Sequence, residues 1–378
     1  MSDVLIWADS IRSPEIRHEV PVAVPDAFLY AEHDGQRHVV VTSFEIDRIE
    51  ATESKLDVLP LEKFGVDDLY AQGMPRDEID LEIVARAAER FGIEHAVVPA
   101  AFPLELADFL RRRGVEVQAD REFFVARRRV KNEAELAGIR RAQRGTEAAM
   151  AAARDLLRRA EPANGTLSVD GEPLTCERLK LAVEQTFSAH ALAADEFIVS
   201  HGPQTAVGHD MGSGPIAPGE PVILDLFPRD RESGCFTDMT RTFVVGGPSE
   251  ELTEYQRLCR EALERAVEAI KPGVMGQELH RQICELFHEH GYPTQLSKQP
   301  GEVLENGFYH GLGHGVGLEV HEQPWIGRSG SPLVAGDVVA VEPGLYRSGY
   351  GGCRLEDLVR VTDDGAEVLT DFPYDLAP

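Results

Sequence analysis

Several features that would point to a membrane or a secreted protein are missing from this sequence. No apolar run approaches the roughly 18 residues that span a membrane, so we expect no membrane partner. The opening M-S-D-V-L-I-W-A-D-S has no basic stretch ahead of its apolar residues, which argues against a secretory signal peptide. We also find no internal repeat and no low-complexity segment. These absences favour a globular protein of the cytoplasm.

Cysteine is scarce as well, with five residues among 378. Their number is odd, they are scattered along the chain, and no C-x-x-C pair occurs. This pattern is typical of reduced thiols in a cytoplasm and argues against a disulfide framework. The five residues are Cys176, Cys235, Cys259, Cys284 and Cys353.

Positive charge is greatly outnumbered, because 38 lysines and arginines face 65 aspartates and glutamates and leave a formal net charge of -27. Such a field repels nucleic acid and anionic membranes, so we expect no nucleic-acid partner. The acidity could serve cation handling or adaptation to high salt, or it could be a well-solvated surface without a specific partner. We favour the last interpretation for most of it.

A length of 378 residues predicts two domains. We place them at 1–128 and 129–378, with the boundary near Arg127–Lys131. In the first part, an amphipathic helix over Pro75–Phe91 ends at Gly92, and a strand and a second helix follow. This alternation predicts a small α/β domain. A docking, dimerising or substrate-capping role is all that its sequence suggests.

The second part begins with the strongest predicted helix of the chain, Asn132–Arg159. Strands follow that are joined by hairpins rather than by helical crossovers. We therefore predict an α+β catalytic domain and not a parallel doubly wound sheet. The further helices are expected at Thr175–Phe187, Glu251–Ile270 and Gly276–His290.

The segment from Val222 to Phe243 is predicted to be a β-hairpin, with its turn in D-R-E-S-G. Each arm carries an acid where an apolar strand residue is expected, Asp225 and Asp238. If the turn is centred between Arg231 and Glu232, the two acids lie directly opposite each other on one face, with Cβ atoms roughly 4.5–5.5 Å apart. They would repel unless one is protonated or a cation lies between them. An exposed hairpin with solvated acids is an equally good interpretation of this segment alone.

A second segment holds three histidines among glycines: F-Y-H-G-L-G-H-G-V-G-L-E-V-H-E-Q-P, from Phe308 to Pro324. The glycines disfavour a helix, since each costs about 1 kcal/mol relative to alanine there, so we expect extended or looped backbone at His310 and His314. His321 is expected at the end of a strand-like stretch, Leu318–His321. A lone histidine is usually packed or exposed, but three within twelve residues favour a site.

Two more segments place acids at or in apolar strands. Glu342 ends the strand in G-D-V-V-A-V-E-P-G-L-Y, and Glu356 lies within the strand pattern of G-G-C-R-L-E-D-L-V-R-V. Arg354 is two residues earlier and would share a face with Glu356 in a regular strand. In isolation, Glu342 could be a solvated strand-end acid, and the other two could form an ordinary salt bridge.

Taken together, one imidazole and four carboxylates can be matched in a partly buried site by two divalent cations. The ligand set suits Mn²⁺, Co²⁺ or Fe²⁺, with Zn²⁺ also possible. Two such ions can polarise a carbonyl and activate water, as in aminopeptidases. The candidate ligands are Asp225, Asp238, His314, Glu342 and Glu356.

These segments resemble the pita-bread metallopeptidases, specifically the Xaa-Pro dipeptidase (prolidase) and Xaa-Pro aminopeptidase branch. The resemblance covers roughly Lys131 to Thr370. It implies a pita-bread catalytic domain preceded by a creatinase-like α/β domain, which would cap the site and help to form a homodimer. The implied substrates are proline-containing dipeptides or oligopeptides, and the implied cofactors are two divalent ions, Mn²⁺ or Co²⁺ above all.

The resemblance also implies a role for each candidate. Asp225 would bind one metal, His314 and Glu342 the other, and Asp238 and Glu356 would bridge both. Glu342 would also act in catalysis. His209, in S-H-G-P-Q-T-A-V-G-H, matches an upstream active-site histidine, and His310 and His321 match histidines on the substrate side.

Two departures from the family pattern concern the rim of the site. Twelve residues separate Asp225 from Asp238, where the family usually has ten; an even difference keeps both acids on one face. Trp325 stands where these enzymes often carry an arginine that reaches a substrate carboxylate, and Arg328 could substitute for it. The two substrate classes are therefore close to even, and we lean to a dipeptidase.

Other functions on the same fold remain open from the sequence. A non-catalytic binding module would be expected to lack metal ligands, whereas all five positions are filled here. A creatinase-like amidinohydrolase would work without metal, so the same positions argue against it. A metal-using lyase or another hydrolase is a further alternative, because fold alone does not fix chemistry.

Overall fold

A computed structural model describes residues 2–52 and 55–378 of the chain. The chain divides into two compact units, Met1–Arg128 and Arg129–Pro378. All five cysteines lie in the described part, and they are free and buried. Within the described residues, no helix combines the length and the apolar character needed to cross a membrane.

The first unit is built on one mixed sheet of six strands in the order β4-β3-β2-β1-β5-β6. The antiparallel pairs are β1 with β2 and β2 with β3, and the outer pairs are parallel. The strands are β1 (Asp3–Ala8), β2 (Phe28–His33), β3 (Gln36–Val41), β4 (Asp57–Pro60), β5 (His95–Val98) and β6 (Glu116–Ala119).

Both faces of this sheet are apolar, because successive side chains of a strand point to opposite faces. Leu5 belongs to one buried cluster and its neighbour Ile6 to another. The predicted helix over Pro75–Phe91 is confirmed as α4, which ends at Gly92 in the left-handed conformation. The helices of the unit are α1 (Pro14–Glu19), α2 (Ile46–Glu50), α3 (Val66–Ala71), α4 (Arg76–Phe91), α5 (Leu104–Arg112) and α6 (Arg121–Arg129), the last of which reaches the boundary.

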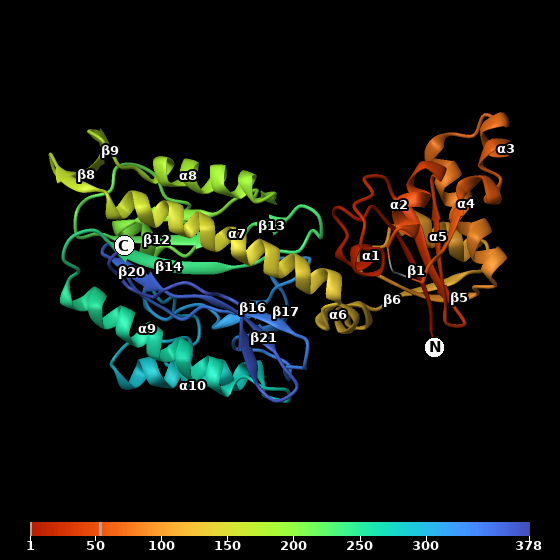
Figure 1. Ribbon diagram of the computed structural model, residues 1–378. Helices are drawn as coiled ribbons and strands as arrows, with labels where there is room; N and C mark the ends of the chain where they lie inside the picture. The colour runs from red at the N-terminus through yellow and green to blue at the C-terminus, as the bar shows by residue number, and fades with distance from the viewer. Residues whose placement is uncertain (1, 53–54) are drawn as a thin grey trace. The chain divides into compact units, whose positions relative to one another are not determined.

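In the second unit, helices cover the sheets from two sides: α7 and α8 lie on one side, α9 and α10 on the other (Figure 1). The predicted helix over Asn132–Arg159 is confirmed as α7. Asn132 accepts a hydrogen bond from the backbone of Glu135, whose side chain accepts one in return, so both donors of this helix start are satisfied. The helices are α7 (Glu133–Arg158), α8 (Cys176–Ala189), α9 (Glu250–Ala269) and α10 (Gly276–Glu289).

Three antiparallel sheets between these helices carry the site. Their orders are β11-β12-β14, β15-β19-β20 and β17-β16-β18-β21-β22. The strands of the second unit are β7 (Glu161–Ala163), β8 (Thr166–Val169), β9 (Glu172–Pro173), β10 (Leu192–Ala193), β11 (Ile198–His201), β12 (Pro221–Leu226), β13 (Arg229–Asp230), β14 (Met239–Val244), β15 (Asn306–Gly307), β16 (Gly313–Gly315), β17 (Glu322–Ile326), β18 (Val338–Val341), β19 (Gly344–Arg347), β20 (Gly351–Arg354), β21 (Asp357–Val361) and β22 (Ala366–Val368). This arrangement confirms the α+β class.

The hairpin predicted over Val222–Phe243 is present, but its predicted register is wrong. Asp225 lies opposite Thr240, not opposite Asp238. The turn is centred one residue later than expected, because Gly234 takes a left-handed conformation and its N–H bonds to the carbonyl of Asp230. A shift of the turn by one residue moves the pairing by two, so the two acids stay on one face as diagonal neighbours.

Two predicted strand assignments are also wrong. Leu318–His321 is an irregular loop, since β16 and β17 pair only through Gly313–Ile326 and Gly315–Glu322 and the residues between form the connection. Glu356 lies outside any strand, between the end of β20 at Arg354 and the start of β21 at Asp357. Arg354 and Glu356 nevertheless both face the cavity described next.

Candidate metal centre and active site

One cavity of about 280 Å³ in the second unit collects most of the polar residues selected from the sequence. All five candidate ligands line it, together with the three candidate histidines and one arginine. The polar lining residues are Asp225, Asp238, Glu342, Glu356, His209, His310, His314, His321 and Arg354.

Four strand ends and the centre of one short strand deliver the five candidate ligands to this cavity. Asp225 is the penultimate residue of β12, and Asp238 directly precedes the neighbouring β14. His314 is the central residue of β16. Glu342 directly follows β18, and Glu356 directly precedes β21. Because β16, β18 and β21 lie in one sheet, their ligands come close together although the sequence separates them.

The glycines beside His314 allow neighbouring strands to approach β16 closely. A Cβ on Gly313 would lie 2.0 Å from the carbonyl oxygen of Ala340, and one on Gly315 would lie 2.3 Å from that of Gln323. No side chain fits at either position without moving the backbone of a neighbouring strand. The glycine-rich pattern therefore serves strand packing around the histidine.

His314 presents an unprotonated nitrogen to the acids. Its Nδ1 lies 3.1 Å from the carbonyl oxygen of Gly315, which can only accept, so Nδ1 carries the proton and donates it. Its Nε2 lies 3.8 Å from Asp238 Oδ2 and 3.8 Å from Glu342 Oε1. Burial, and then the neighbouring His321, lower the pKa of His314 to about 3. A lone pair thus faces two carboxylates.

The carboxylates themselves are crowded, and within the described residues two of their oxygens lack a hydrogen-bond donor. Burial and the neighbouring acids raise the pKa of Asp238 well above its usual value, and the same causes act on Glu356. Burial raises the pKa of Glu342 to about 8. Within the described residues, Asp225 Oδ1 and Asp238 Oδ1 have no hydrogen-bond partner. Acceptors that face only other acceptors need protons or cations between them.

The donor set therefore fits divalent cations. One ligand atom from each of Asp238, His314 and Glu356 lies within 4.8 Å of the other two, and all three residues are buried. Carboxylate oxygens with one imidazole nitrogen suit Mn²⁺, Fe²⁺, Co²⁺ or Zn²⁺. The remaining nitrogen of His314 is already fixed by a backbone carbonyl, as is usual for a histidine that ligates a metal.

Arg354 supplies the positive charge of the cavity wall. Its Nη2 donates to Asp225 Oδ2 at 2.5 Å, its Nη1 to the hydroxyl of Tyr346 at 3.2 Å, and its Nε to Thr240 Oγ1 at 3.3 Å. The ion pair considered from the sequence, with Glu356, is thus made with Asp225 instead. Arg354 holds one oxygen of Asp225 and leaves the other, Oδ1, free for a cation.

The three other histidines line the cavity from different segments. His310 donates from Nδ1 to the carbonyl of Gly311 at 2.7 Å and accepts at Nε2 from the hydroxyl of Tyr346 at 2.9 Å. Burial lowers the pKa of His310 to about 3, and burial also lowers the pKa of His321. His209 lies in a turn that follows Gly202–Ala206. The lowered pKa values keep His310 and His321 neutral, and a neutral imidazole can donate or accept a hydrogen bond.

Trp325 and Arg328 do not belong to the described residues that line this cavity. Trp325 lies in β17 and is 43% exposed. The backbone carbonyl of Arg328 accepts a hydrogen bond from Gln277 in α10. Their roles toward substrate stay predictions.

Sequence reasoning missed several lining or supporting residues. Thr240 donates to Glu356 Oε2 at 2.6 Å, and Tyr346 connects Arg354 to His310. Strand parity could have found Thr240, which lies two residues beyond Asp238 and so shares its face. No sequence pattern of this kind marks the apolar side chains that line the cavity, because they come from separate segments. These side chains are Ile198, Met211, Phe227, Tyr309 and Val320.

Comparison with known proteins identifies the family. Residues 137–363, more than half of the chain, match the model of metallopeptidase family M24. The chain belongs to metallopeptidase family M24. This membership confirms the predicted pita-bread fold of the second unit. It also agrees with a buried cluster of carboxylates and histidine that could hold a metal.

Within the M24 family, the relatives include an Xaa-Pro dipeptidase from Pyrococcus furiosus, which is 39% identical over 179 residues. The matched region is 47% of this chain and 47% of that relative, so the chain matches about half the length of this curated relative.

Solved structures extend the likeness over both units. A prolidase from Pyrococcus furiosus has 25% sequence identity and a TM-score of 0.75, with 99% of this chain and 97% of that chain covered. An X-Pro aminopeptidase from Thermotoga maritima has 22% identity and a TM-score of 0.78, with 98% and 96% covered. At that identity the second likeness concerns the fold alone.

Proposed function

We propose that this M24 peptidase hydrolyses Xaa-Pro peptide bonds with the help of divalent cations, and that it is an Xaa-Pro dipeptidase. The observation that carries the proposal is that four carboxylates and His314 line one cavity, where the lone pair of His314 faces Asp238 and Glu342. Two carboxylate oxygens there have no partner in the described part of the chain. The relative named Xaa-Pro dipeptidase supports the choice of substrate.

The five residues would hold two ions, Mn²⁺ or Co²⁺ in preference to Fe²⁺ or Zn²⁺. Asp225 would ligate one ion and His314 with Glu342 the other, while Asp238 and Glu356 would contact both. Bound divalent cations would neutralise the acids, polarise the scissile carbonyl and lower the pKa of water. Arg354 fixes the orientation of Asp225, because Arg354 Nη2 donates to Asp225 Oδ2.

The chain's own residues would then bind the substrate and move its protons. Glu342 would accept a proton from the attacking water and return it to the proline nitrogen when the C–N bond breaks. His209 and His321 would donate hydrogen bonds to the substrate carbonyl or carboxylate. His310, whose two ring nitrogens are bonded to Gly311 and Tyr346, would line the substrate side of the cavity. The apolar wall that includes Phe227 and Ile198 offers a surface for the proline ring.

Hydrolysis of longer peptides, by an Xaa-Pro aminopeptidase, is the second candidate. It is favoured by the charge of the cavity wall, because Arg354 is the only lysine or arginine among the described lining residues and its Nη2 is bonded to Asp225. A free carboxylate beyond proline gains about 1.5–3 kcal/mol from a charge-assisted hydrogen bond. That gain corresponds to about tenfold to a hundredfold in preference for dipeptides.

The two candidates are separated by kcat/KM for Ala-Pro and Ala-Pro-Ala with Mn²⁺- or Co²⁺-loaded protein. A dipeptidase prefers Ala-Pro, and a strong preference for Ala-Pro-Ala assigns the second candidate instead. Trp325 occupies the position where related enzymes often carry an arginine that reaches the substrate carboxylate. If Arg328 takes over that role, Arg328→Ala should lower Ala-Pro hydrolysis selectively. Ala-Ala is the matched control: equal cleavage of Ala-Ala and Ala-Pro would contradict specificity for proline.

Three further features belong to the same proposal. The protein would be a homodimer, and its first unit would be a creatinase-like domain. It would act in the cytoplasm, where the five free, buried thiols would stay reduced.

A further inference from the structure

Arg241 is a buried arginine outside the cavity, with only 1% of its surface exposed. It follows Thr240 in β14, so its side chain points to the opposite face of the strand. Its guanidinium group has five N–H donors, and five oxygen atoms receive them. A buried cation with a complete set of partners makes a rigid connection.

Three of these oxygens belong to the candidate ligand Glu356 or to residues next to it. Arg241 Nη1 donates to the backbone carbonyl of Glu356 at 2.8 Å and to that of Thr240 at 2.9 Å. Nη2 donates to Asp357 Oδ1 at 2.8 Å, in an ion pair whose two side chains are each 1% exposed. The arginine thus joins β14 to the start of β21.

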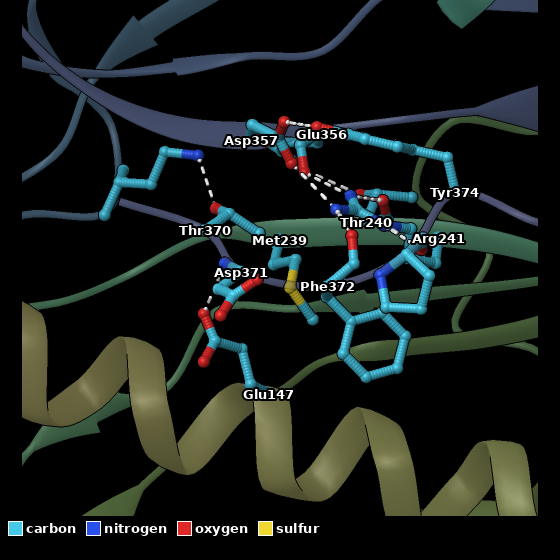
Figure 2. Close-up of polar contacts among 12 residues, drawn as sticks. Glu147, Met239, Thr240, Arg241, Glu356, Asp357, Thr370, Asp371, Phe372 and Tyr374 are labelled. Atoms are coloured by element: carbon cyan, nitrogen blue, oxygen red, sulfur yellow. Dashed lines mark hydrogen bonds and ion pairs between the residues drawn. The ribbon is translucent and has the colours of Figure 1, made fainter. Parts of the chain in front are cut away.

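The other two oxygens belong to a segment near the end of the sequence, Asp371–Tyr374. Nη2 also donates to the carbonyl of Phe372 at 2.9 Å, and Nε donates to that of Pro373 at 3.0 Å. The Tyr374 ring lies 4.5 Å from the guanidinium carbon, and the Tyr374 hydroxyl donates to Asp357 Oδ2. Figure 2 shows these contacts around Arg241.

The same segment is bonded to the rest of the second unit through its first residue and through Leu376, two residues beyond its end. The N–H of Asp371 donates to Glu147 of α7 at 2.8 Å (Figure 2), and the N–H of Val244 donates to the carbonyl of Leu376 at 2.7 Å. Asp371–Tyr374, which we call the strap, therefore lies on the face of β14 that points away from the cavity, and Arg241 is its central contact.

Glu356 needs such a support because it lies between β20 and β21, outside the sheet ladder. Its N–H donates to the carbonyl of Thr240 at 3.1 Å, and its Oε2 accepts from Thr240 Oγ1 at 2.6 Å. Its own carbonyl is held by Arg241. Removing the arginine would leave that carbonyl buried without its charged partner and free the ligand's backbone to shift.

We infer that Arg241, completed by the strap Asp371–Tyr374, is a positioning residue that sets the carboxylate of Glu356 for cation binding. Substitution of a residue that hydrogen-bonds to a metal ligand typically changes metal affinity by about tenfold to a hundredfold. The inference rests on the cation-binding part of the proposed function.

The test is a Co²⁺ titration of metal-free full-length protein, followed by equilibrium dialysis and by the visible absorption of bound Co²⁺. Arg241→Lys keeps the charge but loses the fork of donors, so we expect Co²⁺ affinity to fall by at least about tenfold and the visible spectrum to change. Tyr374→Phe keeps Arg241 but removes the hydrogen bond from the strap to Asp357, and a fall of about threefold with the same spectral change is expected. Arg360→Met removes a half-exposed arginine of β21 and should change neither readout.

The outcomes separate the two ideas. If wild-type protein binds no Co²⁺, the proposed cation site fails. If wild type binds Co²⁺ and folded Arg241→Lys matches its affinity and spectrum, the cation site stands and Arg241 is only structural. If Arg241→Lys does not fold, Tyr374→Phe decides: wild-type affinity and spectrum in that variant overturn the inference.

Discussion

Two buried polar clusters lie on opposite faces of β14, and they differ in one respect. On the cavity face, Asp238 and its neighbour Asp225 each leave an oxygen without a partner in the described part of the chain. On the other face, every donor of Arg241 has an acceptor, and Asp357 accepts from both Arg241 and Tyr374. Both clusters are buried and charged, so burial of charge alone does not mark a site.

Whether every buried polar atom has a partner distinguishes a binding site from a structural contact in this protein. A complete set of partners fixes backbone geometry and needs nothing further. An incomplete set, with acceptors facing acceptors, is unfavourable until a cation arrives. The alternation of Thr240 toward the cavity and Arg241 away from it lets one strand serve both purposes.

The largest effect is expected on the incomplete cluster. Asp238→Asn should lower Xaa-Pro hydrolysis by at least about 10³-fold, since cation catalysis contributes several kcal/mol. The same change should leave the stability of metal-free protein unchanged or raised, because it removes a buried acid with an unpaired oxygen. Peptidase assays and thermal unfolding measure the two effects.

Asp363→Asn, an exposed change in the same unit, is the matched control and should alter neither quantity. Full activity of Asp238→Asn would remove this residue from the catalytic site.

A substitution in the complete cluster, unlike one in the incomplete cluster, should lower the stability of the protein. Arg241→Met leaves Asp357 buried without its ionic partner, and breaking a buried pair on one side typically costs about 3–5 kcal/mol in the free energy of unfolding. Urea unfolding measures this loss. Arg360→Met, which removes a half-exposed pair with Glu367, should cost less than about 1 kcal/mol. Equal losses in the two variants would contradict the distinction between the clusters.

A smaller loss is expected for a cavity histidine that is not a proposed ligand. His321→Ala should lower kcat by about 10²–10³-fold, as removal of one hydrogen-bond donor to a developing oxyanion does. Metal content, measured by elemental analysis, should stay at the wild-type value. Loss of metal would mean that His321 is a ligand. His288→Ala, on the exposed side of α10, should change neither quantity.

The smallest effect concerns a buried polar side chain that stays neutral. Burial lowers the pKa of His280 to about 4, against about 6.5 in an unfolded chain. As pH falls below about 6.5, the unfolded chain binds a proton first, so stability decreases until pH 4, by up to about 3 kcal/mol. Urea unfolding at pH 7.5 and pH 4.5 should show a smaller decrease for His280→Gln than for wild type. The control His288→Gln should keep the wild-type decrease.

Local patterns predicted the helices and the strand-end ligands because their causes are local. The capping residues around α7 and α4 are visible in the sequence, and Glu342 follows an uninterrupted apolar strand. The face shared by Asp225 and Asp238 also follows from parity, which survives an error of two residues in register.

What the sequence could not predict depends on single hydrogen bonds or on distant segments. The hairpin register follows from the contact between Gly234 and Asp230, and a one-residue change in a turn leaves no trace in the apolar pattern. The pairing of Arg354 with Asp225 joins residues 129 positions apart. The strap Asp371–Tyr374 has no periodic pattern, and only the folded chain brings it to Arg241.

The central claim is that the incomplete cluster is a site for two divalent cations. The most direct measurement is the number of Mn²⁺ ions bound per chain by wild-type protein after stripping and reloading, determined together with Ala-Pro hydrolysis. We expect two ions per chain, and we expect activity to disappear on stripping and return on reloading. A stripped protein that remains fully active, or a reloaded protein that binds no Mn²⁺, would contradict the claim.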